Sequence, residues 1–416
     1  MNGKSLPYLK KVETLRSNHI IAILGVGVVL SLLGDNTLYT VLPDPTIAAQ
    51  AGLSLTMVGV VLGINRLVRV VFNPLAGSLF DRLPRRGLMV ASIGVAVLST
   101  SFYAIAKGPE LLIAGRILWG LAWSGIWVGA NTVALDSSKV GNRGRIGGRL
   151  QMWFFLGAAV SALAGGLFTD LLGYRGGLWL SSFLTFLAFL LWSGFLPETR
   201  SNGLSQPNAN LQSGQTVPFP WLQTLSAALP YFALRFAIAG VLSATTILWL
   251  SQFVDGGISL VGLAVPLATL TGSFVALRVL ISMLSAPAAG SISDKSGRRW
   301  IVLTLALILG GLGLWLMSFP ILIPALAGAL LATISAGGIQ GLVPATVGDW
   351  IGVGQQSRAL GIVFTVGDFG SALGPPLGLW MISFVGLGGV YRMCALLFFM
   401  IGGFAAWQAS KERKAF

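Results

Sequence analysis

Two segments of this sequence carry the same pattern of glycine, acidic and basic residues at the end of a long apolar run. They read GSLFDRLPRRG from Gly77 and GSISDKSGRRW from Gly290, 213 positions later. The same offset relates Asp136 to Asp349, well beyond these segments. A constant offset over such a length indicates two copies of one structural unit, because chance similarity does not keep a fixed spacing. The chain is therefore expected to fold as two related halves.

The composition excludes a soluble fold. Hydrophobic residues make up 55% of the 416 residues and charged residues 10%, whereas soluble domains carry about 25% charged residues. Apolar runs of about 20 residues, the length that spans a bilayer as a helix, recur from end to end. The bilayer accepts only helices or closed barrels, and these uninterrupted runs lack the alternation of barrel strands. The sequence therefore predicts an all-α polytopic membrane protein, and repeated membrane-spanning units are typical of transporters.

The apolar runs predict twelve transmembrane helices in two pseudo-symmetric halves of six. Their expected positions are 18–42, 54–80, 88–106, 110–135, 147–172, 176–196, 223–253, 260–292, 301–319, 321–348, 359–386 and 389–409. A polar stretch rich in Ser, Asn, Gln, Gly and Pro separates the sixth run from the seventh, as a linker does. We therefore expect a first half at 1–196, a cytoplasmic linker at 197–222 and a second half at 223–416.

The basic residues are distributed unevenly across this predicted topology. The net charge is +14, and most of the 27 Lys and Arg residues fall in the termini and in one set of loops. This asymmetry follows the positive-inside rule, which places both termini in the cytoplasm. The basic excess thus indicates orientation and attraction to anionic lipid headgroups, with no need for nucleic acid as a partner.

Few residues suit metal, nucleotide or catalytic chemistry. The chain has one cysteine, Cys394, and one histidine, His19, so we expect no disulfide, metal site or other cofactor. No P-loop lysine follows a Gly-rich turn, so nucleotide hydrolysis is not expected to supply energy. No nucleophile–His spacing indicates an enzyme. The single thiol and the plain membrane topology fit a bacterial inner membrane.

The two repeated turns resemble the signature of the major facilitator superfamily, roughly G-x-x-x-D-R/K-x-G-R/K-R/K between spans 2 and 3 and again between spans 8 and 9. The second copy matches throughout, at Gly290, Asp294, Lys295, Gly297, Arg298 and Arg299. The first copy matches at Gly77, Asp81, Arg82, Arg85 and Arg86 and has Pro84 in place of the usual glycine. A proline fixes φ and removes a backbone donor, so the finer geometry of this turn is expected to differ.

Further segments extend the resemblance to other spans. RILWGLAWSG from Arg116 is similar to an arginine-led motif of proton-coupled members. ALDSSKVGNRGRIGG after span 4 and VGDWIGVGQQSRALG after span 10 resemble the acid-turn-Arg-Gly pattern of bacterial drug and solute exporters. Span 5 departs from the antiporter pattern G-x-x-x-G-P-x-x-G-G, since it reads GAAVSALAGG from Gly157, and a Gly-Pro form stands instead in span 11, as GSALGPPLG from Gly370. The resemblance implies a secondary transporter of the exporter branch.

Acidic and basic residues at the cytoplasmic span ends are candidates for a conformational latch. A carboxylate there can pair with a neighbouring arginine or cap a helix N-terminus. Contacts made in one conformation only would bias the inward–outward equilibrium, whereas a static surface ion pair contributes about 1 kcal/mol or less. The resemblance implies the latch. Its candidate residues are Gly77, Asp81, Arg82, Arg85, Arg86, Asp136, Arg145, Gly290, Asp294, Lys295, Arg298, Arg299, Asp349 and Arg358.

Seven charged residues fall inside the predicted spans and away from the span ends, where each is costly unless it is paired or faces a cavity. Five are arginines and two are acids, so three arginines lack an intramembrane acid. This surplus of positive charge favours an anionic substrate, unless arginines near the outer side snorkel to the interface. The candidate substrate-binding residues are Arg66, Arg69, Arg235, Arg278 and the aromatic Trp123.

The two intramembrane acids are the candidate proton carriers. Asp35 lies in the outer half of span 1, where the resemblance implies an acid in proton-coupled members, and Asp368 lies in the GDFG stretch of span 11. A carboxyl group in a low-dielectric cavity can cycle between protonated and ionised forms. Arg116 joins them as a proton-coupling candidate through its motif. The alternative is an interior network in which both acids neutralise neighbouring arginines and hold helices together.

Three functions remain open at this stage. The first is secondary active transport of a small organic solute by alternating access, with proton-coupled export as the expected form. The second is uptake or exchange of an organic anion on the intramembrane arginines. The third is a membrane sensor that keeps the fold without transport. The expected partners are a small-molecule solute, protons and the lipid bilayer, and the expected assembly is a monomer.

Overall fold

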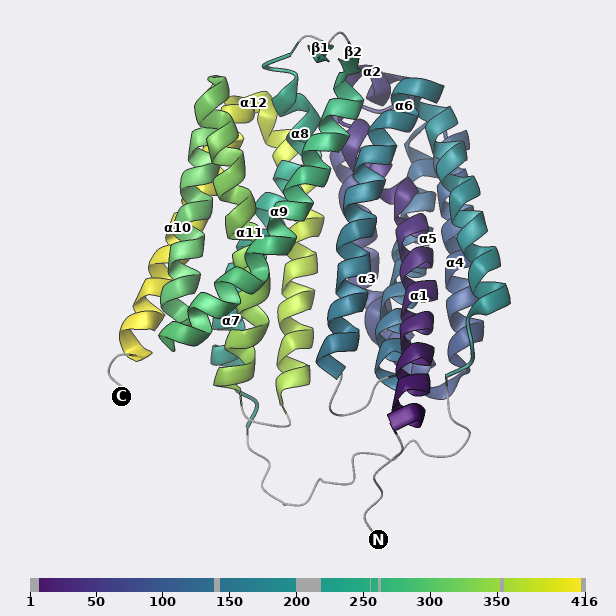
Figure 1. Cartoon of the computed structure of the whole chain (residues 1–416). Coiled ribbons are helices and arrows are strands. Elements are labelled where there is room, and N and C mark those ends of the chain that lie inside the picture. The colour runs from purple at the N-terminus through teal and green to yellow at the C-terminus, as the bar shows by residue number, and fades with distance from the viewer. Residues whose placement is uncertain are drawn as a thin grey trace.

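The apolar runs fold into long helices that lie side by side (Figure 1). The computed structural model describes residues 7–137, 143–199, 218–254, 256–260, 263–351 and 355–412. Its elements in chain order are α1 (Pro7–Val41), α2 (Pro45–Gln50), α3 (Leu55–Arg82), α4 (Arg85–Ile105), α5 (Pro109–Asp136), α6 (Arg143–Phe195), α7 (Trp221–Ala233), the π-helix η1 (Leu234–Leu242), α8 (Ser243–Leu250), β1 (Gly257–Leu260), β2 (Leu263–Pro266), α9 (Leu267–Ser296), α10 (Arg299–Met317), α11 (Leu322–Trp350) and α12 (Gln356–Glu412). The all-α fold class predicted from composition is confirmed.

Two of the long helices are pairs of membrane spans joined by a sharp turn. α6 turns back at Gly173 and α12 at Gly386, where φ is 75° and 67°, a backbone that glycine adopts at little cost. The two glycines are related by the 213-residue offset of the sequence repeat. α7, η1 and α8 form one continuous span from Trp221 to Leu250. The ten membrane-length helices of the described residues therefore make twelve crossings, as predicted.

One predicted boundary is wrong. The hydropathy pattern starts span 8 at 260, but α9 begins at Leu267, and the residues before it form an antiparallel hairpin of β1 and β2. Gly256 and Gly257 have φ of 73° and 155°, which break the helical path. Pro266 at the N-cap of α9 cannot continue a preceding helix. The aliphatic residues of the hairpin raise the local hydropathy, so the pattern alone extends the span too far.

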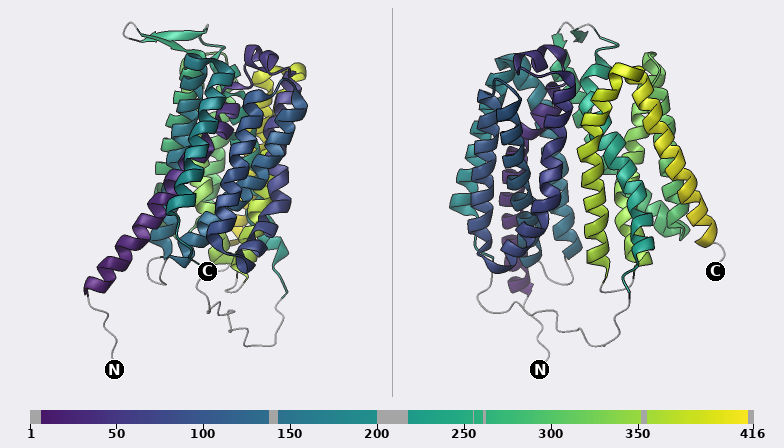
Figure 2. Two further views of the ribbon diagram at one scale, coloured as in Figure 1. Left: turned by 90° about the vertical axis from the view of Figure 1, so that its right-hand side faces the viewer. Right: turned by 180° about the vertical axis from the view of Figure 1, so that it is seen from behind.

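Each half of the chain has its own hydrophobic core. One core is built mainly from α1 to α6 and the other from α7 to α12. Figure 2 shows the two groups of helices as adjacent bundles. The predicted linker at 197–222 lies mostly outside the described residues, and α1 begins at Pro7, well before the predicted span start at 18. The division into 1–196 and 223–416 stays a prediction that this packing favours.

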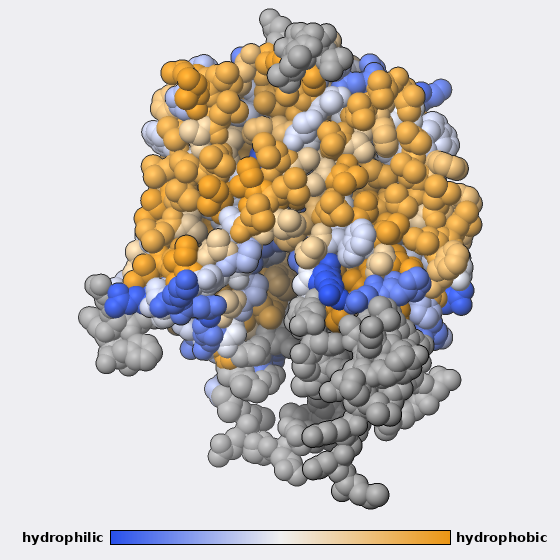
Figure 3. All heavy atoms as spheres, in the orientation of Figure 1, coloured by the Kyte–Doolittle hydropathy of each residue, from blue (hydrophilic) through white to orange (hydrophobic). Residues whose placement is uncertain are grey.

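The two halves touch toward one end of the bundle and part toward the other. A Cβ built on Gly59 of α3 would lie 2.6 Å from the Cα of Pro376 of α12, and Cβ atoms on Gly166 and Gly272 would clash with backbone of α9 and α6. These contacts lie toward the end that carries the β hairpin. We call the opposite end the basic end, because it holds the start of α1, the end of α12 and the arginines of 82–86 and 298–299 (Figure 1). A hollow between the halves opens there (Figure 3).

Candidate functional site

A carboxylate near the middle of the bundle joins the two halves. Asp368 of α12 accepts hydrogen bonds from Arg69 Nη2 of α3, at 3.1 Å to Oδ2 and 3.3 Å to Oδ1, and from Arg235 Nη2 of η1 at 3.1 Å. Arg235 Nη2 also donates to Ser371 Oγ at 3.4 Å. The side chains are 10% exposed for Asp368, 12% for Arg69 and 20% for Arg235. One acid therefore pairs with an arginine of each half in a site largely screened from water.

Local helix geometry places Arg235 at this site. η1 is a π-helix, a form that is rare and frequent at functional sites. Within it, Gly240 packs against Gly374 of α12, where a Cβ on Gly240 would lie 2.8 Å from the Cα of Gly374. Small residues let two membrane helices approach closely. This close approach brings Arg235 within reach of Asp368.

The cluster carries more positive than negative charge. Arg66 lies one turn before Arg69 on α3, and its guanidinium is 5.9 Å from the centre of the Tyr39 ring. The Nε atoms of Arg66, Arg69 and Arg235 are buried without a hydrogen-bond partner. Two arginines thus pair with one carboxylate in the described part of the chain, and Arg66 adds a third positive charge one helical turn away, which favours an anionic group nearby.

The other intramembrane acid lies in a closed cluster of the first half. Asp35 of α1 pairs with Arg116 Nη1 of α5 and accepts from Asn65 Nδ2 of α3 at 3.4 Å. Arg116 Nε and Nη2 donate to the backbone oxygens of Val61 and Leu62 at 2.9 and 3.1 Å. Arg116 is 0% exposed and Asp35 5%. The cluster ties α1, α3 and α5 together, which is the geometry of the interior ion pair that the sequence leaves as an alternative.

Arg278 is a second buried cation, on α9 of the other half. Its Nε donates to Thr333 Oγ1 at 3.2 Å, and its guanidinium lies 6.0 Å from the centre of the Phe274 ring. The residue is 9% exposed, and within the described ranges no acidic side chain forms an ion pair with it. Arg278 is therefore another position where an anionic group would relieve an uncompensated charge.

The aromatic candidate Trp123 belongs to a ladder of indole rings on α5. It stacks between Trp119 and Trp127 with centroid distances of 5.7 and 5.8 Å, and it is 5% exposed. Trp127 is half-buried and lies 5.0 Å from Phe154 of α6. The structure thus places Trp123 in the interior of the first half, where packing accounts for it, and Trp127 at the border of that interior.

At the basic end of the first half, acidic side chains hold the start of α4. Arg85 Nε lies 3.3 Å from Asp136 Oδ2, and the backbone N–H groups of Arg85 and Arg86 donate to the two carboxylate oxygens of Glu198 at 3.0 and 3.1 Å. Thr199 Oγ1 donates to Asp136 at 3.1 Å. Negative charge is favourable at a helix N-terminus. The residues that follow the sixth span therefore fix the start of the third.

The equivalent cluster of the second half uses the next arginine of the repeat. Arg299 Nε lies 2.6 Å from Asp349 Oδ2, and its Nη1 lies 2.5 Å from Asp294 Oδ1. Gly297 ends α9 in the left-handed region with φ of 63°. Pro84, at the matching position, precedes α4 with ψ of 133°. The two turns follow different backbone paths, as the proline predicts, and a different arginine reaches the acid in each.

The remaining latch candidates are only partly placed. The side chain of Asp81 and that of Arg145 lie outside the described residues. The Arg358 guanidinium lies 4.5 Å from the centre of the Phe219 ring, just before α7. Arg82, Lys295 and Arg298 are exposed, and a Cβ built on Gly77 or Gly290 would meet open space. The two clusters described above each stay within one half, so the latch stays a prediction.

Sequence reasoning missed several polar partners of the charged residues. Asn65 gave a signal, because a carboxamide inside a predicted span is costly without a partner. Ser371 and Thr333 gave none, because such hydroxyls usually bond their own helix backbone. Glu198 looked like part of the linker. Among the described residues, no group of three or more His, Cys, Asp or Glu side chains meets as a metal site requires.

The chain is similar in sequence to known membrane transporters. The family profile described as Major Facilitator Superfamily matches residues 24–279 and 258–415. The class B tetracycline resistance protein of Escherichia coli is 26% identical over 308 residues, which cover 68% of this chain and 74% of that protein. The class D tetracycline resistance protein of Salmonella ordonez is 23% identical over 368 residues, 86% of each chain.

Solved structures share the fold over nearly the whole length. A bacterial homologue of the human lysosomal transporter Spinster, in an inward-facing and unoccupied conformation, has a TM-score of 0.71 at 16% identity, with 95% of both chains covered. A POT family transporter in complex with a thioalcohol conjugated peptide has a TM-score of 0.76 at 12% identity, with 94% of this chain and 96% of that chain covered. At these identities the likeness concerns the fold alone.

Proposed function

This chain belongs to the Major Facilitator Superfamily, and from that premise we propose that it is a proton-coupled exporter of a small organic solute. The family and the multi-pass helical fold make it a membrane transporter and not an enzyme. The similarity to tetracycline resistance proteins favours export as the direction. The energy source in this proposal is the proton gradient, used by antiport.

The observation that carries the proposal is the Asp368 carboxylate between arginines of both halves. While it is ionised, it attracts Arg69 in the first half and Arg235 in the second. Protonation removes this negative charge, and Arg69 of α3 and Arg235 of η1 then repel each other across the contact between the halves. Proton binding at Asp368 would therefore bias the equilibrium between arrangements of the two halves, which is what coupling requires.

The solute path in this proposal starts at the basic end. The positive-inside rule assigns that end, and with it both termini, to the cytoplasm of a bacterial inner membrane. A solute entering the hollow there reaches the Asp368 cluster at the level where the halves meet. Because a solute that contacts the Asp368 carboxylate would compete with the proton for it, solute binding and proton release are linked reciprocally.

Asp35 and Arg116 have a supporting part in this mechanism. Their ion pair is sealed between α1, α3 and α5, so a proton reaches Asp35 only when these helices separate. We therefore assign the main proton-carrying role to Asp368 and keep Asp35 as a second group. The clusters around Arg85 and Arg299 would act as the latch by fixing span ends in this conformation.

The testing experiment follows protons and solute together in liposomes. The reconstituted vesicles hold a pH-sensitive dye under clamped voltage, and tetracycline is the first probe, followed by fluorescent organic cations and anions. We expect solute-evoked proton movement in the wild type and in Asp44→Asn, which changes the half-buried N-cap of the short helix α2, outside the long spans. Asp368→Asn should move no protons when solute is added. Proton movement of wild-type size in Asp368→Asn would contradict the proposal.

A second candidate is the uptake or exchange of an organic anion. It is favoured by the surplus of cations, namely Arg66 beside the Asp368 cluster and Arg278, which has no acidic partner within the described ranges. If the protein transports an organic anion in this way, fluorescein, used as an anionic probe, should show a saturable flux without proton movement. Arg278→Gln should then raise the concentration for half-maximal flux about tenfold, the loss expected for one charged hydrogen bond. An unchanged half-maximal concentration removes Arg278 from the binding site.

A further inference from the structure

The contact between α6 and α9 opens into a pocket as the two helices run toward the basic end. The helices touch where Ala162 meets Gly272 and where Gly166 meets Ala268. Antiparallel helices in continued contact would next bring residues near 152–156 against residues near 278–283. The helices part instead, and a pocket of about 390 Å³ lies between them. This pocket, called the seam pocket below, belongs to both halves at once.

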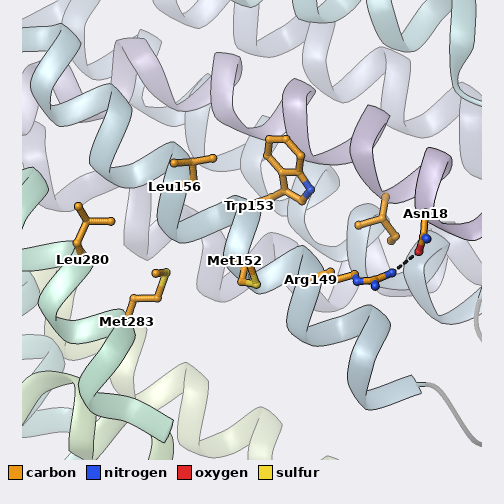
Figure 4. Close-up of a pocket in the computed structure, with 8 residues that line it drawn as sticks. Asn18, Arg149, Met152, Trp153, Leu156, Leu280 and Met283 are labelled. Atoms are coloured by element: carbon orange, nitrogen blue, oxygen red, sulfur yellow. Dashed lines mark hydrogen bonds between the residues drawn. The ribbon is translucent and has the colours of Figure 1, made fainter. Parts of the chain in front are cut away.

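The walls of the seam pocket are apolar. α6 supplies one side, α9 supplies the other, and α1 lies behind them (Figure 4). Met152 is 60% exposed and Leu156 43%, so the outer lip of the pocket is open at the apolar surface of the bundle. The lining residues are Ile21, Met152, Trp153, Leu156, Leu280 and Met283, with Asn18 and Arg149 at one edge. A pocket of this kind suits a hydrocarbon chain entering from the bilayer.

The polar edge of the seam pocket carries one cation. Arg149 Nη1 donates to Asn18 Oδ1 (Figure 4). Asn18 follows the basic residues Lys10, Lys11 and Arg16 in the sequence, and Arg149 follows Arg143 and Arg145. Basic residues gather where a span leaves the cytoplasmic face, so Asn18 and Arg149 are placed near the level of the lipid headgroups. Within the described part of the chain, no acidic side chain pairs with Arg149. A positive charge thus stands at headgroup depth directly beside an apolar pocket.

We propose that the seam pocket binds an anionic phospholipid of the surrounding leaflet, with an acyl chain between α6 and α9 and the phosphate at Arg149. The apolar walls match the chain, and the uncompensated guanidinium matches the phosphate. The site exists while the two helices are parted, so the bound lipid stabilises this conformation over one in which the seam closes. The proposal concerns the conformational equilibrium and is independent of solute and coupling ion.

The first experiment measures the seam by distances between spin labels in lipid nanodiscs. Labels are placed on Gly147→Cys of α6 and Ile292→Cys of α9, both exposed, in a Cys394→Ala background. Phosphatidylcholine discs are compared with discs that also contain phosphatidylglycerol. The anionic lipid should raise the ratio of parted to closed seam about fivefold. This factor corresponds to the attraction of one arginine to an anionic membrane surface, about 1 kcal/mol.

Charge variants separate this site from general attraction of a basic protein to an anionic membrane. Arg149→Gln should abolish the dependence on phosphatidylglycerol. Lys411→Gln removes a cation at the end of α12, at the same end of the bundle but far along the second half, and should keep the dependence. If Arg149→Gln responds to phosphatidylglycerol as the wild type does, the phosphate is not bound at Arg149 and the proposal is overturned.

A matched pair of bulky substitutions tests the acyl chain. Met283→Trp fills the seam pocket and should remove the response, whereas Leu284→Trp changes the neighbouring residue, which is 68% exposed and outside the pocket lining, and should preserve it. Soluble glycerol phosphate should not mimic the lipid, because it has no chain to fill the pocket. A response in Met283→Trp equal to that in Leu284→Trp, or one produced by glycerol phosphate, would refute chain binding.

Discussion

Replacing Asp368 by Asn perturbs the charge balance of the central cluster and should lower stability strongly. The change removes the one carboxylate that Arg69 and Arg235 contact at 3.1 Å, in a site where the three side chains are 10–20% exposed. Each unit-charge pair at such a distance contributes about 4 kcal/mol at an effective dielectric constant of 20, before desolvation is counted. Breaking a buried pair by removing one partner costs about 3–5 kcal/mol, and we take about 3 because the site is slightly open.

The matched change Arg69→Gln should lower the stability less than Asp368→Asn does. Combined with Asp368→Asn, it should restore part of the stability that Asp368→Asn loses. Asp368 keeps its contact with Arg235 in Arg69→Gln, so about 1 kcal/mol is lost. In the wild type, Arg66, Arg69, Arg235 and Asp368 together carry a net charge of +2. Asp368→Asn raises this net charge to +3, and the double variant returns it to +2. The double variant should therefore be more stable than Asp368→Asn alone, although two residues are changed.

Thermal unfolding of the purified protein in one detergent is the assay. With about 2–4 °C per kcal/mol for a unit the size of one half, Asp368→Asn should lower the apparent Tm by about 6–12 °C. Asp44→Asn, at the half-buried N-cap of α2, serves as the carboxylate control and should change the apparent Tm by about 2 °C or less, because Asn caps a helix as well as Asp does. The reasoning is refuted if Asp368→Asn behaves like this control, or if the losses of the two single variants add in the double variant.

Three other changes probe separate parts of the molecule. Gly272→Leu should reduce transport severalfold, because a side chain at this position meets the backbone of α6. Gly403→Leu places the same side chain in open space and should transport normally, so equal rates in the two variants would refute the packing argument. Arg116→Gln leaves the buried Asp35 unpaired and should cost about 3–5 kcal/mol, seen as a loss of monodisperse protein in size-exclusion chromatography; a wild-type elution profile would contradict it. Glu198→Gln weakens the cap of α4 and should cost about 0.5–1 kcal/mol, read as a Tm lower by a few degrees; an unchanged Tm would count against the cap.

The sequence predicts the architecture well because that architecture repeats. The offset that relates the two signature turns also relates Gly173 to Gly386, where the helices turn back. Hydropathy locates the crossings because each must match one bilayer thickness. It fails at the β hairpin before Leu267, since an aliphatic strand and an aliphatic helix have the same hydropathy, and only the backbone of Gly256 and Gly257 separates them.

The candidate site was predictable as a set of residues but not as a set of pairs. The cost of burying charge singles out the intramembrane arginines and acids from one sequence. Their partners depend on how each helix is rotated and which helices are neighbours across the halves. Arg69 and Asp368 are 299 positions apart, so no local pattern relates them. Arg116 and Asp35 likewise meet across 81 positions, and their burial depends on the packing of three helices.

In α6 and in α12, the helical segment before the turn glycine, called the first arm here, can act as a lever that pivots about that glycine. The arms, 143–172 and 356–385, are the ones that contact the opposite half, and each joins its second arm through a single residue with no loop between them. An arm of about 30 residues is about 45 Å long. A tilt of about 10° about the glycine therefore moves the free end sideways by about 8 Å. A small rotation at the tightly packed end of the molecule is thus enough to open a gate as wide as a small organic molecule at the other.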